Sequence, residues 1–209
     1  MKSRGRCGLP FIIVIDGPNF INELHRHGKD KEYIMNKLSL PNLQAVIQEK
    51  LRENGLYSHP FLHTEFVCSN KPQIGEFKGR ERTRLLKKLM SERGVSVRKV
   101  ELSSKGEQEK GVDITVFATM LERGGLLTHI VLIGADRDYV PALNALTKRN
   151  IHTIVAGFKD GKFVDLLINE SYLFLDLKEL LAEMEKIKEG DKQKLIELDK
   201  SAKQQLNPS

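Results

Sequence analysis

The chain has 209 residues, a formal net charge of +6, 40% hydrophobic residues and two cysteines. This length accommodates one α/β domain with a substantial core, and the basic balance favours a polyanionic partner without requiring one. The cysteines lack metal-ligand spacing and form no disulfide framework, no signal peptide is recognisable, and no apolar run approaches the roughly 20 residues of a membrane-spanning helix. We therefore expect an intracellular, cytoplasmic protein that does not engage a membrane.

The first predicted element is a buried strand at residues 11–16, where five consecutive apolar residues end on a carboxylate and turn residues follow. The polar stretch at 21–39 is interpreted as a solvated loop or a short helix. Apolar residues then recur at helical spacing from Leu40 until Asn54-Gly55 supplies a stop. Residues 61–68 alternate as in a strand.

A strongly basic segment follows a predicted loop at residues 69–75. Residues 78–90 are predicted to be helical, and they carry six cations against a single acid, Glu81. This helix presents either a solvated face or a groove for the backbone of a polyanion. A strand is expected at 95–102 and a polar loop at 103–110.

The second half of the chain alternates strands and helices. The expected elements are a buried helix at 111–122, a strand at 129–133, a helix at 139–148, a strand at 151–156, a short helix at 163–168 and a last strand or extended segment at 172–177. Continuous apolar strands separated by helices are typical of a parallel sheet covered on both faces, so the predicted fold class is a three-layer α/β/α sandwich with a mainly parallel sheet.

The predicted domain organisation has three parts. A basic segment occupies residues 1–10, the α/β domain residues 11–177, and a charged helix with a mobile tail residues 178–209. This last part holds seven lysines and seven acids. The positive charge therefore belongs to the preceding residues.

Four carboxylates occupy corresponding places in the predicted topology. Asp16 ends the first strand, Asp113 lies in the first turn of its helix, and Asp136 and Asp138 follow the strand at 129–133. Carboxyl ends of neighbouring parallel strands meet at one edge of a sheet, where such folds bind their ligands. Crowded carboxylates repel one another unless cations neutralise them, which favours Mg²⁺ or Mn²⁺. Asn19 could orient a carboxylate or hold a phosphate oxygen.

Several other phosphate chemistries lack their residues in this chain. A glycine-rich phosphate loop ending in Lys-Ser/Thr is absent, which argues against a nucleoside triphosphatase. Pro18 stands where a phosphatase of the haloacid dehalogenase type needs its second Asp. A receiver-type phosphoacceptor Asp and a nucleophile elbow are also missing.

Three ordered blocks carry a family resemblance: Asp16-Gly17-Pro18-Asn19, Lys110-Gly111-Val112-Asp113, and Gly134-Ala135-Asp136-Arg137-Asp138-Tyr139 with Pro141-Ala142-Leu143. They resemble the signature blocks of the NYN domain, the LabA-like branch of the PIN-like nuclease superfamily. The resemblance extends from about Phe11 to Asp176 and implies a PIN-like sandwich and a metal-dependent ribonuclease. Its metal-site positions fall on Asp16, Asn19, Asp113, Asp136 and Asp138.

Two positions depart from the pattern of many members of that family. Arg137 stands where they have Gly in Ser-Gly-Asp-Gly-Asp, so a bulky cation lies beside the expected site. Thr119 stands where they carry a further acid in the helix of Asp113.

We therefore expect a divalent-metal-dependent endoribonuclease that hydrolyses RNA phosphodiester bonds by metal-activated water. The four aspartates are the expected ligands of Mg²⁺ or Mn²⁺, with Asn19 also catalytic. The residues expected to contact single-stranded or structured RNA are Lys71, Lys78, Arg80, Arg82, Arg84, Lys87, Lys88 and Arg137. Aromatics make up only 6% of the chain, so we expect weak sequence specificity.

Two alternatives stay open at this point. The chain could be a non-cleaving RNA-binding or protein-interaction module that keeps the fold, or a nuclease acting on DNA. The sequence leaves the oligomeric state open, a homodimer included.

Overall fold

The computed structural model describes residues 11–56, 61–100, 110–124, 129–134, 136–161 and 164–187. The predictions of a basic segment at 1–10, of a loop over 103–109 and of a tail beyond residue 187 lie outside the described residues.

A six-stranded parallel sheet forms the centre of the protein. Its strands are β1 (Phe11–Asp16), β2 (Phe61–Ser69), β5 (Val95–Val100), β6 (His129–Ile133), β7 (His152–Gly157) and β8 (Leu173–Asp176). All six residues of β1 are buried, as expected for a central strand with a continuous apolar run.

The order of the strands across the sheet is β5-β2-β1-β6-β7-β8. The chain thus builds outward from β1 in one direction and then, from β6, in the other. Such a reversal leaves a crevice beyond the carboxyl ends of the two strands that flank it, here β1 and β6. Asp16 is the last residue of β1, so the fold places it at this crevice.

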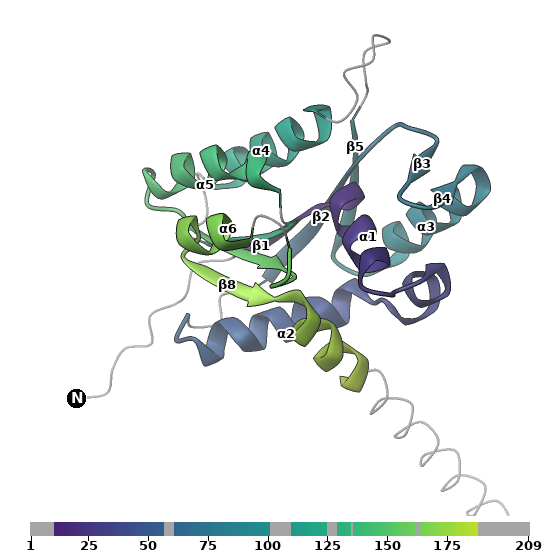
Figure 1. Ribbon diagram of the computed structural model, residues 1–209, viewed down its shortest axis with the longest axis horizontal. Coiled ribbons are helices and arrows are strands. Elements are labelled where there is room, and N and C mark those ends of the chain that lie inside the picture. Colours follow the sequence, from purple (N-terminus) through teal and green to yellow (C-terminus); the bar gives the residue numbers. More distant parts are fainter. Residues whose placement is uncertain are drawn as a thin grey trace, which may run out of the picture.

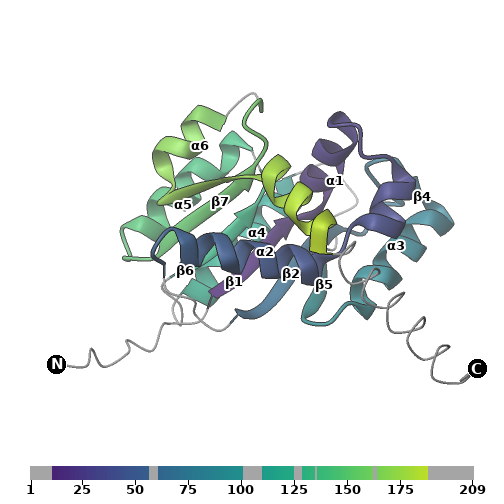
Figure 2. The same cartoon turned by 90° about the horizontal axis from the view of Figure 1, so that it is seen from below.

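Helices cover both faces of the sheet (Figures 1 and 2). They are α1 (Gly17–Arg26), α2 (Leu40–Glu53), α3 (Gly79–Ser91), α4 (Lys110–Gly124), α5 (Val140–Thr147) and α6 (Val164–Glu170), with a π-helix η1 (Tyr33–Lys37) and a 3₁₀ turn η2 (Arg137–Tyr139).

The alternation of side chains along β1 separates two cores. Phe11, Ile13 and Ile15 pack with α1, α2 and α3, whereas Ile12 and Val14 pack with α4, α5 and α6. The three-layer α/β/α sandwich with a mainly parallel sheet is therefore confirmed.

One local prediction is confirmed in its second alternative, and another needs correction. The stretch at 21–39, interpreted as a solvated loop or a short helix, holds the end of α1, which buries Ile21 and Leu24, and the π-helix η1, which buries Ile34. The loop predicted at 69–75 contains half of a small antiparallel hairpin, formed by β3 (Gln73–Ile74) and β4 (Phe77–Lys78). Two-residue strands are too short to show the alternation that identifies a strand.

A final helix over residues 177–187 packs into the same core as α1 and α2. Leu177, Leu180, Leu181 and Met184 are buried there. Within the described residues, no helix combines the length and the apolar character needed to cross a membrane.

Candidate active site

Asp16 joins the end of β1 to the start of α1. Its Oδ1 accepts a hydrogen bond from the backbone N–H of Asn19 at 3.1 Å, so the carboxylate caps the helix. Gly17 is needed directly after it, because a Cβ at this position would lie 2.7 Å from the carbonyl oxygen of Val67. Pro18 in the first turn completes a rigid connection. Each residue of the motif Asp16-Gly17-Pro18-Asn19 thus has a structural role in this connection.

Tyr139 links the aspartates of two other elements. Its hydroxyl donates to Oδ2 of Asp16 at 2.6 Å and lies 3.2 Å from Oδ1 of Asp113, in the first turn of α4. The ring is buried, and burial beside the two carboxylates raises the pKa of Tyr139 well above its usual value. The hydroxyl therefore keeps its proton and holds β1, α4 and η2 together at this edge.

Asp16 is 4% exposed, and burial raises its pKa from 3.8 to about 6. The hydrogen bonds from Tyr139 and Asn19 oppose this rise, while the negative charges of Asp113 and Asp136 add to it. The aspartates are thus close enough to repel one another, as expected of carboxylates that share a site.

Asp136 and Asp138 form a turn directly after β6. Asp136 caps η2 by accepting a hydrogen bond from the backbone N–H of Asp138 at 3.1 Å. The side chain of Asp138 is 65% exposed, and its Oδ1 lies 3.7 Å from Nε of Arg137. Arg137 is equally exposed, so its guanidinium lies at the surface beside Asp138.

One cleft of about 490 Å³ unites these groups. All four aspartates and Asn19 line it, as do Lys71 and residues of the β3–β4 hairpin. The structure therefore brings together every acid that the sequence pattern selected.

The fit to a metal ion has two sides. Carboxylate oxygens are the donors that a hard divalent cation prefers, and a cation here would offset the negative charges of Asp113 and Asp136 that raise the pKa of Asp16. Among the residues that the structure describes, however, no three His, Cys, Asp or Glu side chains are already arranged around a common point. The donor chemistry therefore fits a divalent cation, although the described side chains do not yet surround a common point. The hydroxyl of Tyr139 holds two of the carboxylates, those of Asp16 and Asp113, in their present positions.

The hydrogen bond of Thr119 lies away from the four aspartates. Its Oγ1 accepts a hydrogen bond from Arg98 of β5 at 2.9 Å, and Arg98 also pairs with the buried Glu65 of β2. The substitution at this position thus serves a polar network between α4 and the sheet.

The predicted basic residues divide into two groups. Arg82 donates to the carbonyl oxygen of Ser69 at 2.8 Å, and Lys88 donates to that of Leu38 at 2.8 Å, so both fasten α3 to its surroundings. The exposed members of the helix follow one another at i, i+4 and i+7, which puts them on one stripe: Arg80, Arg84 and Lys87. Lys78 is the hairpin partner of Gln73, and Lys71 lines the cleft, so the stripe begins beside the site.

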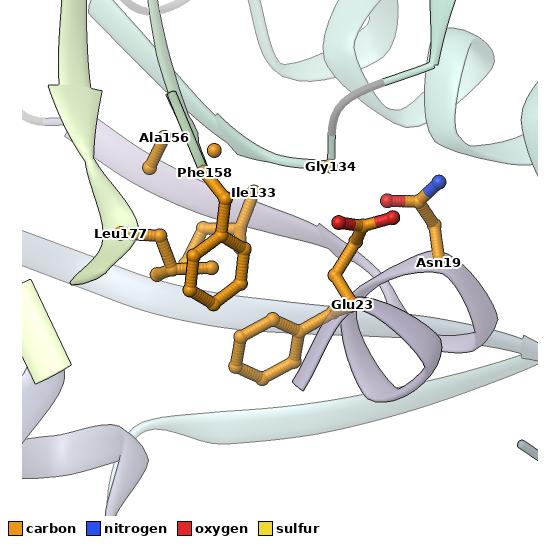
Figure 3. Close-up of a pocket in the computed structure, with 9 residues that line it drawn as sticks. Asn19, Glu23, Ile133, Gly134, Ala156, Phe158 and Leu177 are labelled. Carbon is orange, nitrogen blue, oxygen red and sulfur yellow. The ribbon is translucent and has the colours of Figure 1, made fainter. Parts of the chain in front are cut away.

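Glu23 is a buried acid that the sequence analysis did not select. It is 9% exposed, lies one turn after Asn19 on α1, and shares with it a small pocket below the end of β6. Figure 3 shows the Glu23 carboxylate and the Asn19 amide on the same side of α1, both directed towards Gly134. Arg26 pairs with Oε1 of Glu23 at 2.7 Å. The sequence signal that could have identified Glu23 was an acid on the inward-facing stripe of an amphipathic helix.

Comparisons with known proteins agree with this architecture. The family model of the NYN domain matches residues 12–178. A crystal structure of a protein of unknown function, VPA0982 from Vibrio parahaemolyticus RIMD 2210633, is similar with a TM-score of 0.52 and 15% identity, covering 85% of this chain and 96% of that one. At this identity the likeness shows the fold alone. None of the curated proteins matches the chain.

Proposed function

The chain belongs to the NYN domain family, whose fold is that of the PIN-like nucleases, and from this membership we propose that it is a divalent-metal-dependent endoribonuclease of the LabA-like branch. The observation that carries the proposal is the cleft at the β1–β6 crevice, lined by Asp16, Asp113, Asp136 and Asp138. Four acids in one cleft need positive charge, and the phosphodiester backbone of RNA cannot approach them without it.

In this proposal the four aspartates hold Mg²⁺ or Mn²⁺. When bound, such a cation supplies Lewis-acid stabilisation of charge on the phosphate and lowers the pKa of a coordinated water. The hydroxyl of Tyr139 keeps the carboxylates of Asp16 and Asp113 in place. Asn19 lies at the start of α1, where its side chain can orient a carboxylate or a phosphate oxygen. Lys71 lines the same cleft and contributes a positive charge there.

The decisive experiment is a cleavage assay on end-labelled RNA with Mg²⁺, Mn²⁺ or EDTA, with DNA of the same sequence alongside. Internal cuts in RNA that require a divalent ion support the proposal. Cuts in DNA alone would identify a DNA nuclease instead. RNA that is bound but stays intact in all metals would return the chain to the non-cleaving module.

The basic stripe Arg80–Arg84–Lys87 is proposed to carry the RNA backbone away from the cleft. Replacing Arg80 and Arg84 by Ala is expected to reduce the slope of log K against log salt by about 1.4, because each lost phosphate contact on a single strand contributes about 0.7. The measurement is RNA binding by fluorescence anisotropy between low and moderate salt.

A matched control for the stripe removes the same charge elsewhere. Lys148 and Arg149 are exposed in the turn that precedes β7, at the amino edge of the sheet. Replacing both by Ala is expected to leave the slope unchanged. Equal slopes for the two double variants would mean that α3 is only a solvated helix.

A further inference from the structure

Two chemically different sets of groups line the cleft. The four aspartates come from the ends of β1 and β6 and from the start of α4, and we call them the acidic side. Neutral hydrogen-bonding groups come from α1, from the end of β2 and from β3, namely Asn22, Ser69 and Gln73. We call the two carboxamides among them, Asn22 and Gln73, the amide wall. Pro18 adds apolar surface, and Lys71 lies in the same lining.

The amide wall is held in place by the packing of the hairpin on α1. Gly75, with φ of +54°, forms the turn, and a Cβ there would lie 2.7 Å from Cγ2 of Ile21. Phe77 is buried and stacks on the ring of His25, with the centroids 6.0 Å apart. Glu76 approaches Nδ1 of the same histidine at 3.9 Å. The backbone of the hairpin that carries Gln73 is therefore fixed against α1, while the side chains of Asn22 and Gln73 are exposed.

Carboxamides suit one class of ligand in particular. Each presents a donor and an acceptor in one plane, the pattern that matches the edge of a nucleobase. In RNA the Watson–Crick and Hoogsteen edges are open to side chains on unpaired bases, because a double helix uses the first in its pairs and hides the second in its deep, narrow groove. A cleft of about 490 Å³ has the size of a site for one small ligand such as a nucleotide.

We propose that the amide wall binds the edge of one unpaired nucleobase of the RNA while the adjacent phosphate lies against the acidic side. This inference rests on the proposed function, since it takes the acidic side as the place of the scissile phosphate. It also modifies the expectation of weak sequence specificity, because one position of the RNA is read by hydrogen bonds rather than by aromatic stacking.

The test is a binding measurement that needs no cleavage. A short RNA is bound in Ca²⁺, which supplies the positive charge that the acidic side needs, with an abasic site moved along the RNA one position at a time. For the wild type, one position is expected to weaken binding about tenfold when its base is missing, the size of one specific base contact. For Asn22→Ala combined with Gln73→Ala, the profile is expected to be flat. A fully paired RNA of the same sequence is expected to bind the wild type at least tenfold more weakly.

Two further variants make the result unambiguous. Asn169 on α6 and Gln48 on α2 lie outside the cleft, so replacing both by Ala makes the same chemical change and should keep the wild-type profile. Gly75→Ala pushes the hairpin off α1 and should lose the sensitive position, with thermal unfolding showing that the domain stays folded. A flat profile in the wild type, or an unchanged one in the double variant, overturns the inference. If the RNA is cleaved but no position is sensitive, only the inference of a base-binding wall is overturned. If one position is sensitive but the RNA is not cleaved, only the nuclease proposal is overturned.

Discussion

Replacing Asp113 by Asn is expected to lower metal-dependent RNA cleavage roughly 100- to 1000-fold, the usual effect of deleting one group that stabilises a transition state electrostatically. The change removes one of the negative charges that face Asp16. The Asn side chain keeps an oxygen that can accept a hydrogen bond from the hydroxyl of Tyr139, which lies 3.2 Å from Oδ1 of Asp113 in the wild type. The loss should therefore come from the missing charge and not from a rearranged site.

The control for this variant is Asp165→Asn. Asp165 is an exposed acid in the first turn of α6, so the substitution repeats the change of charge at the same place in a helix. It does not line the cleft. Cleavage within twofold of the wild type is expected for Asp165→Asn, measured as single-turnover rates at saturating Mn²⁺. An Asp113→Asn protein that keeps more than a tenth of the wild-type rate would remove Asp113 from the proposed metal site.

The convergence of the acids was predictable because it depends on local signals and one topological rule. Strands that are apolar throughout and separated by helices must be parallel and covered on both faces, and parallel strands end at a common edge. Asp16 and Asp136 stand at the ends of such strands, so the sequence predicts that both lie at this edge, and they meet only if the two strands are neighbours. The order itself, with β1 and β6 as neighbours, emerged only from the structure.

Contacts between distant segments explain what sequence reasoning missed. Tyr139 acquires its place by reaching Asp16, 123 residues earlier in the chain, and nothing in its own neighbourhood indicates this bond. The β3–β4 hairpin, which carries Gln73 of the amide wall, is too short to show a strand pattern. Arg82 is different, because it lies three residues before the buried Leu85 and seven before the buried Leu89. Helical periodicity alone could have placed it on the inward stripe.

The replacement Asp16→Asn is expected to stabilise the metal-free protein at neutral pH while abolishing cleavage. Burial raises the pKa of Asp16 from 3.8 to about 6, which corresponds to about 3 kcal/mol of stability lost when the carboxyl ionises in the folded state. An amide cannot ionise, and its oxygen can still accept from the N–H of Asn19. The variant should therefore avoid this cost and keep the helix cap.

The sign of the pH dependence distinguishes this cause from a simple gain in packing. The folded state holds the proton of Asp16 more tightly than the unfolded state, so the cost is absent below pH 4, grows through pH 6 and is complete above it. Denaturant unfolding in EDTA should accordingly give equal stabilities for wild type and variant near pH 4 and a widening gap up to pH 7. Mn²⁺ should then close the gap by stabilising only the wild type, because a ligand that binds the folded state shifts unfolding by mass action. If the stabilities of wild type and variant change in parallel across this pH range, the ionised Asp16 does not destabilise the folded state. A site that receives a cation predicts instead that the two stabilities diverge as the pH rises.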